Sequence, residues 1–229
     1  MKHIKQLYTN GCSFTNDTNL KNNGGTCWPE ILAERLGVEL VNSGHPGSCN
    51  RRVIRTTLRD SINFDSSTLV VVQLPYLFRY EKPYVDETVN RWKVNAPWQH
   101  GEIMESVKPA DGSQSPAAQE YTQCMVKHWE YPALFNENLI DVIMLTGYLR
   151  SKNIPYLIYR HYCEEDLEVV NNSFYQTVLN DPYVFNIDSS FVADINEEKY
   201  YYDSLYAHLN QAGHELLADK LINTLNKCY

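Results

Sequence analysis

The fold is decided near the N-terminus, where residues 8–15 read YTNGCSFT. A short segment with strand character, residues 4–8, leads into Gly11, which lets the backbone leave a strand through angles closed to other residues. Ser13 follows two residues later, and open α/β folds place their chemistry at this carboxyl edge of a parallel sheet. Ser13 is therefore a candidate nucleophile. The alternative is an ordinary strand-to-loop turn, since Gly-Cys-Ser is common turn material.

Further strand and helix patterns extend this start along the chain. Residues 68–75, TLVVVQLP, form a continuous apolar run typical of a central parallel strand buried on both faces. Other strands are expected at 38–42, 155–160 and 183–188, helices at 28–36, 50–62, 136–152, 164–179 and 210–226, and a polar loop at 16–26. This alternation predicts a three-layer, flavodoxin-like α/β fold with about five parallel strands.

The regular pattern breaks down between residues 76 and 131, after the third strand. A loop this long inside a compact domain is usually a lid, a binding insertion or partly disordered. Part of it, residues 119–130, has a helix-compatible sequence. The length favours a single domain over residues 1–229 with this segment as an insertion.

Composition narrows the function classes. The net charge of −8 argues against general nucleic-acid binding, which needs a concentrated basic surface. The chain has no apolar run long enough to span a bilayer and no apolar N-terminal core of a secretion signal, so the expected location is the cytoplasm. The six cysteines are scattered without a Cys-x-x-Cys pair, which argues against a zinc ribbon or a disulfide framework. The 17 tyrosines suit wet contact surfaces such as carbohydrate grooves or protein interfaces.

A partner for Ser13 stands near the C-terminus, where residues 203–214 read DSLYAHLNQAGH before the last helix. An imidazole at His208 suits proton transfer because its pKa lies near neutrality. A carboxylate would fix its tautomer and stabilise the imidazolium, and Asp203 is the nearest candidate. The alternative for His208 is a capping or surface histidine.

Three segments resemble the blocks of one enzyme family. GCSFT at 11–15 resembles the first block of the SGNH, or GDSL-like, serine hydrolases, NSGHPGS at 42–48 the second and HLNQAGH at 208–214 the last. Their order along the chain also fits. The resemblance implies a flavodoxin-like sheet and cofactor-independent hydrolysis of an ester, often an acetyl group on a carbohydrate. It assigns Ser13 as nucleophile, His208 as base, and the backbone N–H groups of Ser13 and Gly47 to the oxyanion hole.

The sequence departs from that family at two positions. Leu205 stands three residues before His208, where the family usually has aspartate. Asp203 lies five residues before His208 and reaches its ring only if the loop between them bulges. Otherwise the site is a Ser-His dyad. The family's third block normally supplies an asparagine after strand three, which is absent here. Gln73 or Asn50 could replace that oxyanion donor, but Gln73 also fits a plain strand residue and Asn50 a helix cap.

Other polar residues near the expected strand ends leave their roles open. Arg79 fits either a substrate-binding cation or a surface charge. HYCE at 161–164 carries ligand-type side chains, but no second cluster completes a metal site, so no metal is expected.

Three function hypotheses follow. The preferred one is a serine esterase acting on a small-molecule or carbohydrate ester. A rival is a catalytically silent relative that binds carbohydrate or a protein partner through the insertion. A nucleotide-binding flavodoxin-like domain is disfavoured because no phosphate-cradling Gly-rich motif follows the first strand. The sequence leaves the oligomeric state open.

Overall fold

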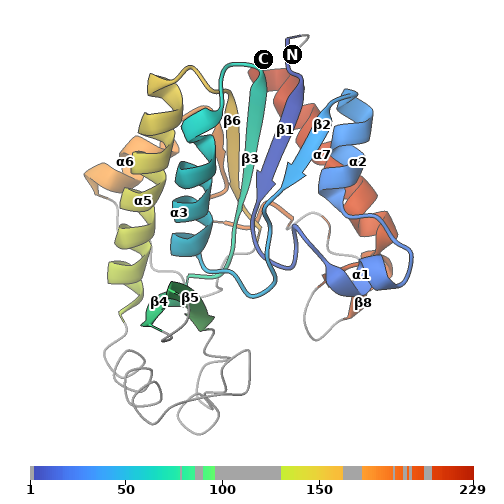
Figure 1. The fold of residues 1–229 in the computed structure, drawn as a ribbon, viewed down its shortest axis with the longest axis horizontal. Coiled ribbons are helices and arrows are strands. Elements are labelled where there is room, and N and C mark those ends of the chain that lie inside the picture. Colours follow the sequence, from blue (N-terminus) through green and yellow to red (C-terminus); the bar gives the residue numbers. More distant parts are fainter. Residues whose placement is uncertain are drawn as a thin grey trace, which may run out of the picture.

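A five-stranded parallel sheet forms the centre of the molecule in the computed structural model (Figure 1). The structure describes residues 3–77, 79–85, 90–95, 130–161, 172–187, 189–192, 195, 198–203 and 208–229. The strand order is β2-β1-β3-β6-β7. The strands are β1 (Gln6–Asn10), β2 (Glu39–Asn42), β3 (Thr68–Leu74), β6 (Tyr156–Arg160) and β7 (Val184–Phe185). All the pairings in this sheet are parallel.

The strand order places the end of β1 at a functionally favoured position. From β1 the chain builds β2 on one side, then crosses back to build β3 on the other. Such a reversal opens a crevice at the carboxyl ends of the two diverging strands, where open α/β sheets bind ligands. The turn after β1, which carries Ser13, therefore lies at the switch point of the sheet.

Helices cover both faces of the sheet (Figure 1). The helix α2 (Trp28–Leu36) and the C-terminal helix α7 (Gln211–Cys228) pack on one face, and α3 (Asn50–Asp60) and α5 (Tyr131–Ser151) on the other. Shorter elements are α1 (Thr18–Asn22), α6 (Ser173–Leu179), the 3-10 turns at Ser61–Asn63 and Glu198–Tyr200, the hairpin β4 (Tyr80–Val85) and β5 (Asn90–Asn95), and the pair β8 (Tyr201–Asp203) and β9 (His208–Leu209).

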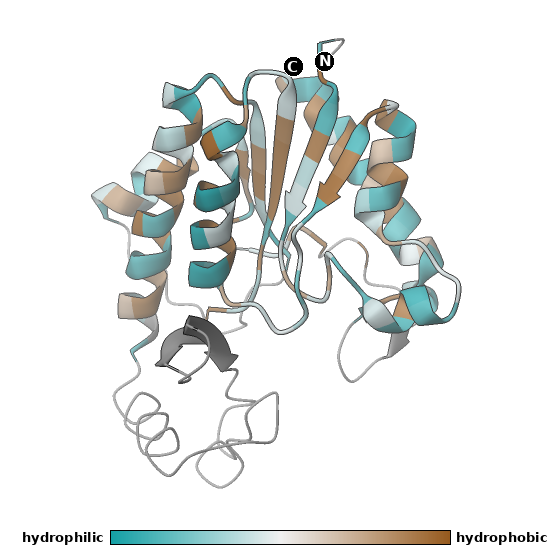
Figure 2. Cartoon of the chain, in the orientation of Figure 1, coloured by the Kyte–Doolittle hydropathy of each residue, from teal (hydrophilic) through white to brown (hydrophobic). Residues whose placement is uncertain are grey.

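The central strand β3 shows why the sequence builds two cores. Its seven residues are all buried, as a continuous β-branched run predicts. Successive side chains alternate between faces, so Leu69 and Val71 join the core under α2 and α7, whereas Val70 and Val72 join the core under α3 and α5. Figure 2 shows the apolar colouring on the strands and the hydrophilic residues on the outer sides of the helices. No helix in the described part of the chain is both long and apolar enough to cross a membrane.

The expected α/β class with about five parallel strands is confirmed. The loop expected at 16–26 is partly wrong because α1 forms inside it: the Asp17 carboxylate accepts from Asn19 N and Leu20 N and caps its first turn. The hairpin β4–β5 forms within the expected insertion and lies at the carboxyl edge of the sheet (Figure 1). The helix expected at 119–130 falls almost entirely outside the described residues, as does the first half of the one expected at 164–179.

Candidate active site

Ser13 lies on a tight turn that leaves β1 and closes immediately. The backbone N–H groups of Thr15 and Asn16 both donate to the carbonyl of Cys12, at 3.0 and 3.1 Å. We call residues 11–16 the Ser13 turn. Ser13 is half-buried, whereas Cys12 and Thr15 on either side of it are buried. The turn therefore buries its flanks and leaves the Ser13 side chain at the surface of the carboxyl edge.

Gln73, the second-last residue of β3, binds this turn through its side-chain oxygen. Its Oε1 accepts from Cys12 N at 2.9 Å and from Thr15 Oγ1 at 3.1 Å. These donors fix the orientation of the amide, because its oxygen must face them. The Gln73 Nε2 group then faces away, buried and with no acceptor within the described residues. A Cβ at Gly11 would lie 2.5 Å from Gln73 Oε1, so only glycine allows this close approach.

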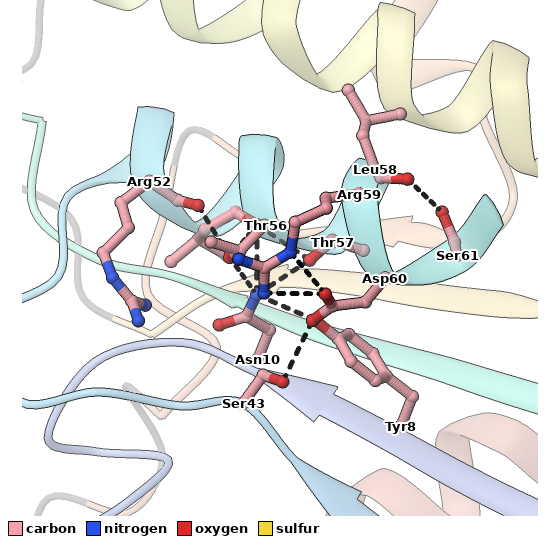
Figure 3. Close-up of polar contacts among 11 residues, drawn as sticks. Tyr8, Asn10, Ser43, Arg52, Thr56, Thr57, Leu58, Arg59, Asp60 and Ser61 are labelled. Atoms are coloured by element: carbon pink, nitrogen blue, oxygen red, sulfur yellow. Dashed lines mark hydrogen bonds and ion pairs between the residues drawn. The ribbon is translucent and has the colours of Figure 1, made fainter. Parts of the chain in front are cut away.

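Asn10, the last residue of β1, ties the Ser13 turn to α3 (Figure 3). Its Oδ1 accepts from Gly11 N at 2.9 Å, the first amide of the turn. Its Nδ2 lies 2.8 Å from Thr56 Oγ1, 3.0 Å from Thr57 Oγ1 and 3.1 Å from the Val53 carbonyl. Because Asn10 is fully buried, these contacts take the place of water. The start of the turn is thereby fixed to the helix that follows the loop after β2.

A second set of contacts extends the same network to β2 (Figure 3). Asp60 accepts from the Tyr8 hydroxyl at 2.9 Å and from Ser43 Oγ at 3.2 Å, and Arg59 Nε donates to it at 2.7 Å. Partial burial opposes ionisation of Asp60, but the hydrogen bonds from Arg59, Tyr8 and Ser43 outweigh it and lower the pKa of the carboxyl. The C-terminal end of α3 is thus held both to β1 and to Ser43, the residue directly after β2.

The loop after β2 lies directly beside the Ser13 turn. His45 N donates to the Gly11 carbonyl at 3.1 Å, and Asn16 Nδ2 donates to the Gly44 carbonyl at 3.0 Å. Gly47 has a φ of 76°, in the left-handed region that favours glycine. Within the described part of the chain, the backbone N–H groups of Ser13 and Gly47 have no hydrogen-bond acceptor. Both amides are the donors that the family resemblance assigns to an oxyanion hole.

His208 reaches Ser13 from the other end of the chain. Its Nε2 lies 3.0 Å from Ser13 Oγ, although 195 residues separate them. His208 begins β9, which pairs antiparallel with β8, and Asp203 is its Cα partner across the pair. The register shifts between Tyr201 and Asp203, so the strand carries an irregularity there. The side chain of Asp203 and all of Leu205 lie outside the described residues.

A cluster of rings centred on Phe14 lies beside His208. The Phe14 ring lies 5.0 Å from the His208 ring, 6.3 Å from Tyr76, and stacks on His161 at 4.3 Å with 13° between the planes. His161 is fully buried at the end of β6. Residues 162–164, which follow it in the candidate metal motif, lie outside the described residues. Among the residues that are described, no group of three or more His, Cys, Asp or Glu side chains could hold a metal ion. The contact with Phe14 supports a packing role for His161.

Tyr76 joins the remaining candidate residues to this group. Asn50, the first residue of α3, donates from Nδ2 to the Tyr76 carbonyl at 3.3 Å. The Arg79 guanidinium lies 5.0 Å from the Tyr76 ring centre and donates to the Ser48 carbonyl at 3.3 Å. Arg79 is buried, which is unlike the plain surface charge that the sequence left open. Asn50 and Arg79 therefore both contact Tyr76, whose ring lies beside Phe14. Arg79 also contacts Ser48, the residue directly after Gly47.

Sequence reasoning missed three buried residues beside this site: Asn10, Trp28, which donates to the Phe14 carbonyl, and His214, which accepts from Trp28 N. Each of the three stands beside a feature that the sequence does reveal: Asn10 precedes Gly11, Trp28 begins an expected helix and His214 ends the last motif. Their tertiary contacts give them their roles, and no local pattern reports such contacts.

Burial of two of the histidines makes stability sensitive to acid. Burial is the main cause that lowers the pKa of His214 to about 4, and it also lowers the pKa of His161. Both rings are neutral in the native protein, whereas an unfolded histidine binds a proton below about pH 6.5. The contribution of these rings to stability is therefore complete above about pH 6.5 and falls as the pH drops towards 4. His214 alone accounts for roughly 3 kcal/mol of unfolding free energy lost across that interval.

Urea unfolding at pH 7, 5.5 and 4.5 checks this expectation, with His214→Asn as the matched variant. Asparagine does not titrate, so the variant should lose less stability than the wild type between pH 7 and 4.5. An identical pH dependence in both proteins would contradict the assignment to His214.

Known proteins resemble this chain in structure and not in overall sequence. No protein-family model matches the chain, and no curated protein sequence matches it. Among solved structures, the esterase EstA from Pseudoalteromonas sp. aligns over 97% of this chain and 97% of its own, with a TM-score of 0.58 and 11% identity.

Two further solved structures align over nearly the whole chain. TesA covers 98% of this chain and 100% of its own with a TM-score of 0.56 and 12% identity. A member of the lipolytic protein G-D-S-L family from Veillonella parvula covers 96% and 97%, with a TM-score of 0.50 and 14% identity. At such identities the likeness concerns the fold. The chain therefore has the fold of the GDSL, or SGNH, hydrolases, which its three sequence motifs resemble.

Proposed function

We propose that the protein is a serine esterase in which Ser13 is the nucleophile and His208 the general base. The observation that carries this proposal is the 3.0 Å contact between Ser13 Oγ and His208 Nε2. A serine hydroxyl is a weak nucleophile until an adjacent base removes its proton. The two groups come from opposite ends of the chain and meet at the switch point of the sheet, as a nucleophile and its base would.

The proposed reaction has two stages. His208 takes the proton of Ser13 Oγ as the oxygen attacks the ester carbonyl, then gives that proton to the departing alcohol. Water, activated by the same imidazole, hydrolyses the acyl-enzyme and releases the acid. Negative charge on the carbonyl oxygen would be held by the backbone N–H groups of Ser13 and Gly47, each such donor contributing roughly 3–4 kcal/mol in known cases.

The third oxyanion donor is proposed to be a side-chain amide. Gln73 and Asn50 are both buried beside the site. The Nδ2 group of Asn50 already donates to the Tyr76 carbonyl, whereas Gln73 Nε2 has no acceptor within the described residues. The satisfied Gln73 oxygen and its unsatisfied nitrogen favour Gln73.

Asp203 is proposed to orient His208. In an antiparallel pair, residues directly opposite each other have Cα atoms about 4.5–5.5 Å apart. The backbone register makes Asp203 the partner of His208, with an irregularity in β8 beside it. A carboxylate five residues before the histidine would thereby do what the family's aspartate does from three residues before.

Asp203→Asn tests this role. We expect kcat to fall by about 10-fold to 10⁴-fold, because an amide cannot stabilise the imidazolium or hold the required tautomer. Asp219→Asn, on the exposed side of α7, serves as a control for the loss of one carboxylate. A wild-type kcat in Asp203→Asn would show that Ser13 and His208 act as a dyad without Asp203.

The proposed substrate is a short acyl ester, with an O-acetyl group on a carbohydrate as the first choice. The family resemblance supports this choice, as does the tyrosine-rich composition. Arg79 and the segment at 76–131 are proposed to shape the substrate groove, since Arg79 is buried beside Ser48 and Tyr76. The alternative of a catalytically silent binding protein rested on the absence of the family's aspartate and asparagine from their usual positions. The Ser13–His208 contact favours the enzyme.

Hydrolysis of p-nitrophenyl acetate, butyrate and octanoate, together with acetate release from peracetylated xylose, tests the proposal. We expect turnover that falls with acyl length and acetate release from the sugar ester. No hydrolysis of any of these esters by folded protein would contradict the esterase function. Turnover of the nitrophenyl esters alone would contradict the carbohydrate choice.

A further inference from the structure

Trp28 is the one described residue that donates hydrogen bonds both to the Ser13 turn and to the helix behind His208. Its indole Nε1 donates to the Phe14 carbonyl at 2.9 Å. Its backbone N–H donates to Nδ1 of His214 at 3.2 Å. Trp28 is fully buried in the core beneath α2 and α7. The two contacts therefore join segments that carry the two partners of the proposed reaction.

The contact with Phe14 fixes the turn on the far side of Ser13. Asn10 and Gln73 hold the amides of Gly11 and Cys12, which precede the serine. The Phe14 carbonyl belongs to the residue directly after it. With Trp28 bound there, the backbone is held by a hydrogen bond on both sides of Ser13.

The contact with His214 holds the start of α7 against α2. The first N–H groups of a helix lack an acceptor within the helix, and the N-cap residue of α2, Cys27, supplies no side-chain acceptor. The His214 ring takes that place. Because Nδ1 accepts, the ring must be neutral, which agrees with its lowered pKa. His214 is 1% exposed, so water does not replace this acceptor.

His208 is coupled tightly to that first turn of α7. Asn210 caps the helix by accepting from Gly213 N at 3.1 Å, and His214 N donates to the Asn210 carbonyl at 3.0 Å. A Cβ on Gly213 would lie 2.5 Å from the Tyr200 carbonyl and 2.9 Å from the Leu209 side chain. Movement of His214 would therefore carry β9, and His208 with it.

We propose that Trp28 is a positioning residue that sets the separation of Ser13 and His208 by binding both segments at once. Its effect on activity rests on the proposed function, but its effect on geometry does not. The hydrogen bonds that Trp28 donates within the described residues end on Phe14 and His214, so it acts through these two neighbours of the reacting groups. Trp28, 15 positions after Ser13 along the chain, thereby affects the geometry of the site.

Two substitutions separate the contacts. Trp28→Phe keeps an aromatic ring in the core and removes the indole donor, and His214→Leu removes the acceptor. We expect kcat on p-nitrophenyl acetate to fall roughly 10-fold to 100-fold in each, with KM little changed, because a misplacement of about 1 Å can cost roughly 100-fold. His214→Asn keeps an acceptor near the position of Nδ1 and should recover most of kcat.

Leu225→Ala is the matched control, since Leu225 is buried in the same core at the other end of α7. It should lower stability and leave the kcat of the folded protein unchanged. If folded Trp28→Phe and His214→Leu also keep the wild-type kcat, the two residues are structural only and the inference is overturned.

A crystal structure of Trp28→Phe, or of His214→Leu if the first variant does not fold, gives a readout independent of activity. We expect the separation of Ser13 Oγ and His208 Nε2 to increase beyond about 3.5 Å, the limit of a hydrogen bond. An unchanged separation of 3.0 Å would overturn the inference whether or not the wild type hydrolyses esters. If the separation increases in the variant and the wild type has no esterase activity, the inference is supported and only the proposed function is rejected.

Discussion

Ser13→Ala and His208→Ala are each expected to lower kcat for a short acyl ester by at least roughly 10³-fold. The reason is that neither group works without the other. The hydroxyl needs a base to become a nucleophile, and the imidazole passes to the leaving alcohol the proton that it takes from the hydroxyl. Steady-state kinetics on purified variants measures the effect, with circular dichroism to establish that each variant is folded.

The double variant sharpens this prediction. Residues that act as one unit have non-additive effects, so Ser13→Ala combined with His208→Ala should be no slower than either single variant. The rate left in all three would come from whatever oxyanion donors and substrate contacts the site retains. A single variant that keeps a tenth or more of the wild-type kcat would contradict the assignment of that residue.

Gly11→Ala is expected to damage the site and the fold together. An added Cβ would lie 2.5 Å from Gln73 Oε1 and closer still to Thr15 Oγ1, both of which are buried and bonded to each other. Overpacking of this kind costs about 1–3 kcal/mol of unfolding free energy. Displacing Gln73 also frees the Cys12 amide, so Ser13 shifts and kcat should fall by roughly 100-fold.

Gly147→Ala is the matched control, and its expected change in stability has the opposite sign. Gly147 lies exposed in α5, and a Cβ there would meet nothing within 4 Å. Alanine in a helix is more stable than glycine by roughly 0.5–1 kcal/mol, so this variant should be slightly more stable and fully active. Chemical denaturation and kcat of both variants check the pair. Equal stability and activity in Gly11→Ala and the wild type would contradict the close packing beneath the turn.

The layered fold could be predicted because its signals are local. The run at 68–74 is mostly apolar and β-branched, which is typical of a central parallel strand buried on both faces, and it forms β3. The contact between Ser13 and His208 was predicted from the order of three motifs along the chain. No local pattern could have placed them together, since 195 residues separate them.

The supports of the site depend on tertiary geometry and were beyond the sequence. Gln73 fits a strand residue equally well until the parallel register with β1 places its amide under Cys12. Asn10 shows its role only once α3 packs across β1 and presents Thr56 and Thr57 to it. Asp203 lies five residues before His208 along the chain, and only the antiparallel register of β8 and β9 makes it the backbone partner of His208.

Labelling with a fluorophosphonate probe tests the central claim most directly, because the phosphonyl group reacts with an activated serine and stays attached. Mass spectrometry of digested wild-type protein should place the label on Ser13, with no label in Ser13→Ala and a large loss in His208→Ala. Gly147→Ala, which leaves the site intact, should be labelled like the wild type. An unlabelled wild type, or a label that persists in Ser13→Ala, would contradict the account.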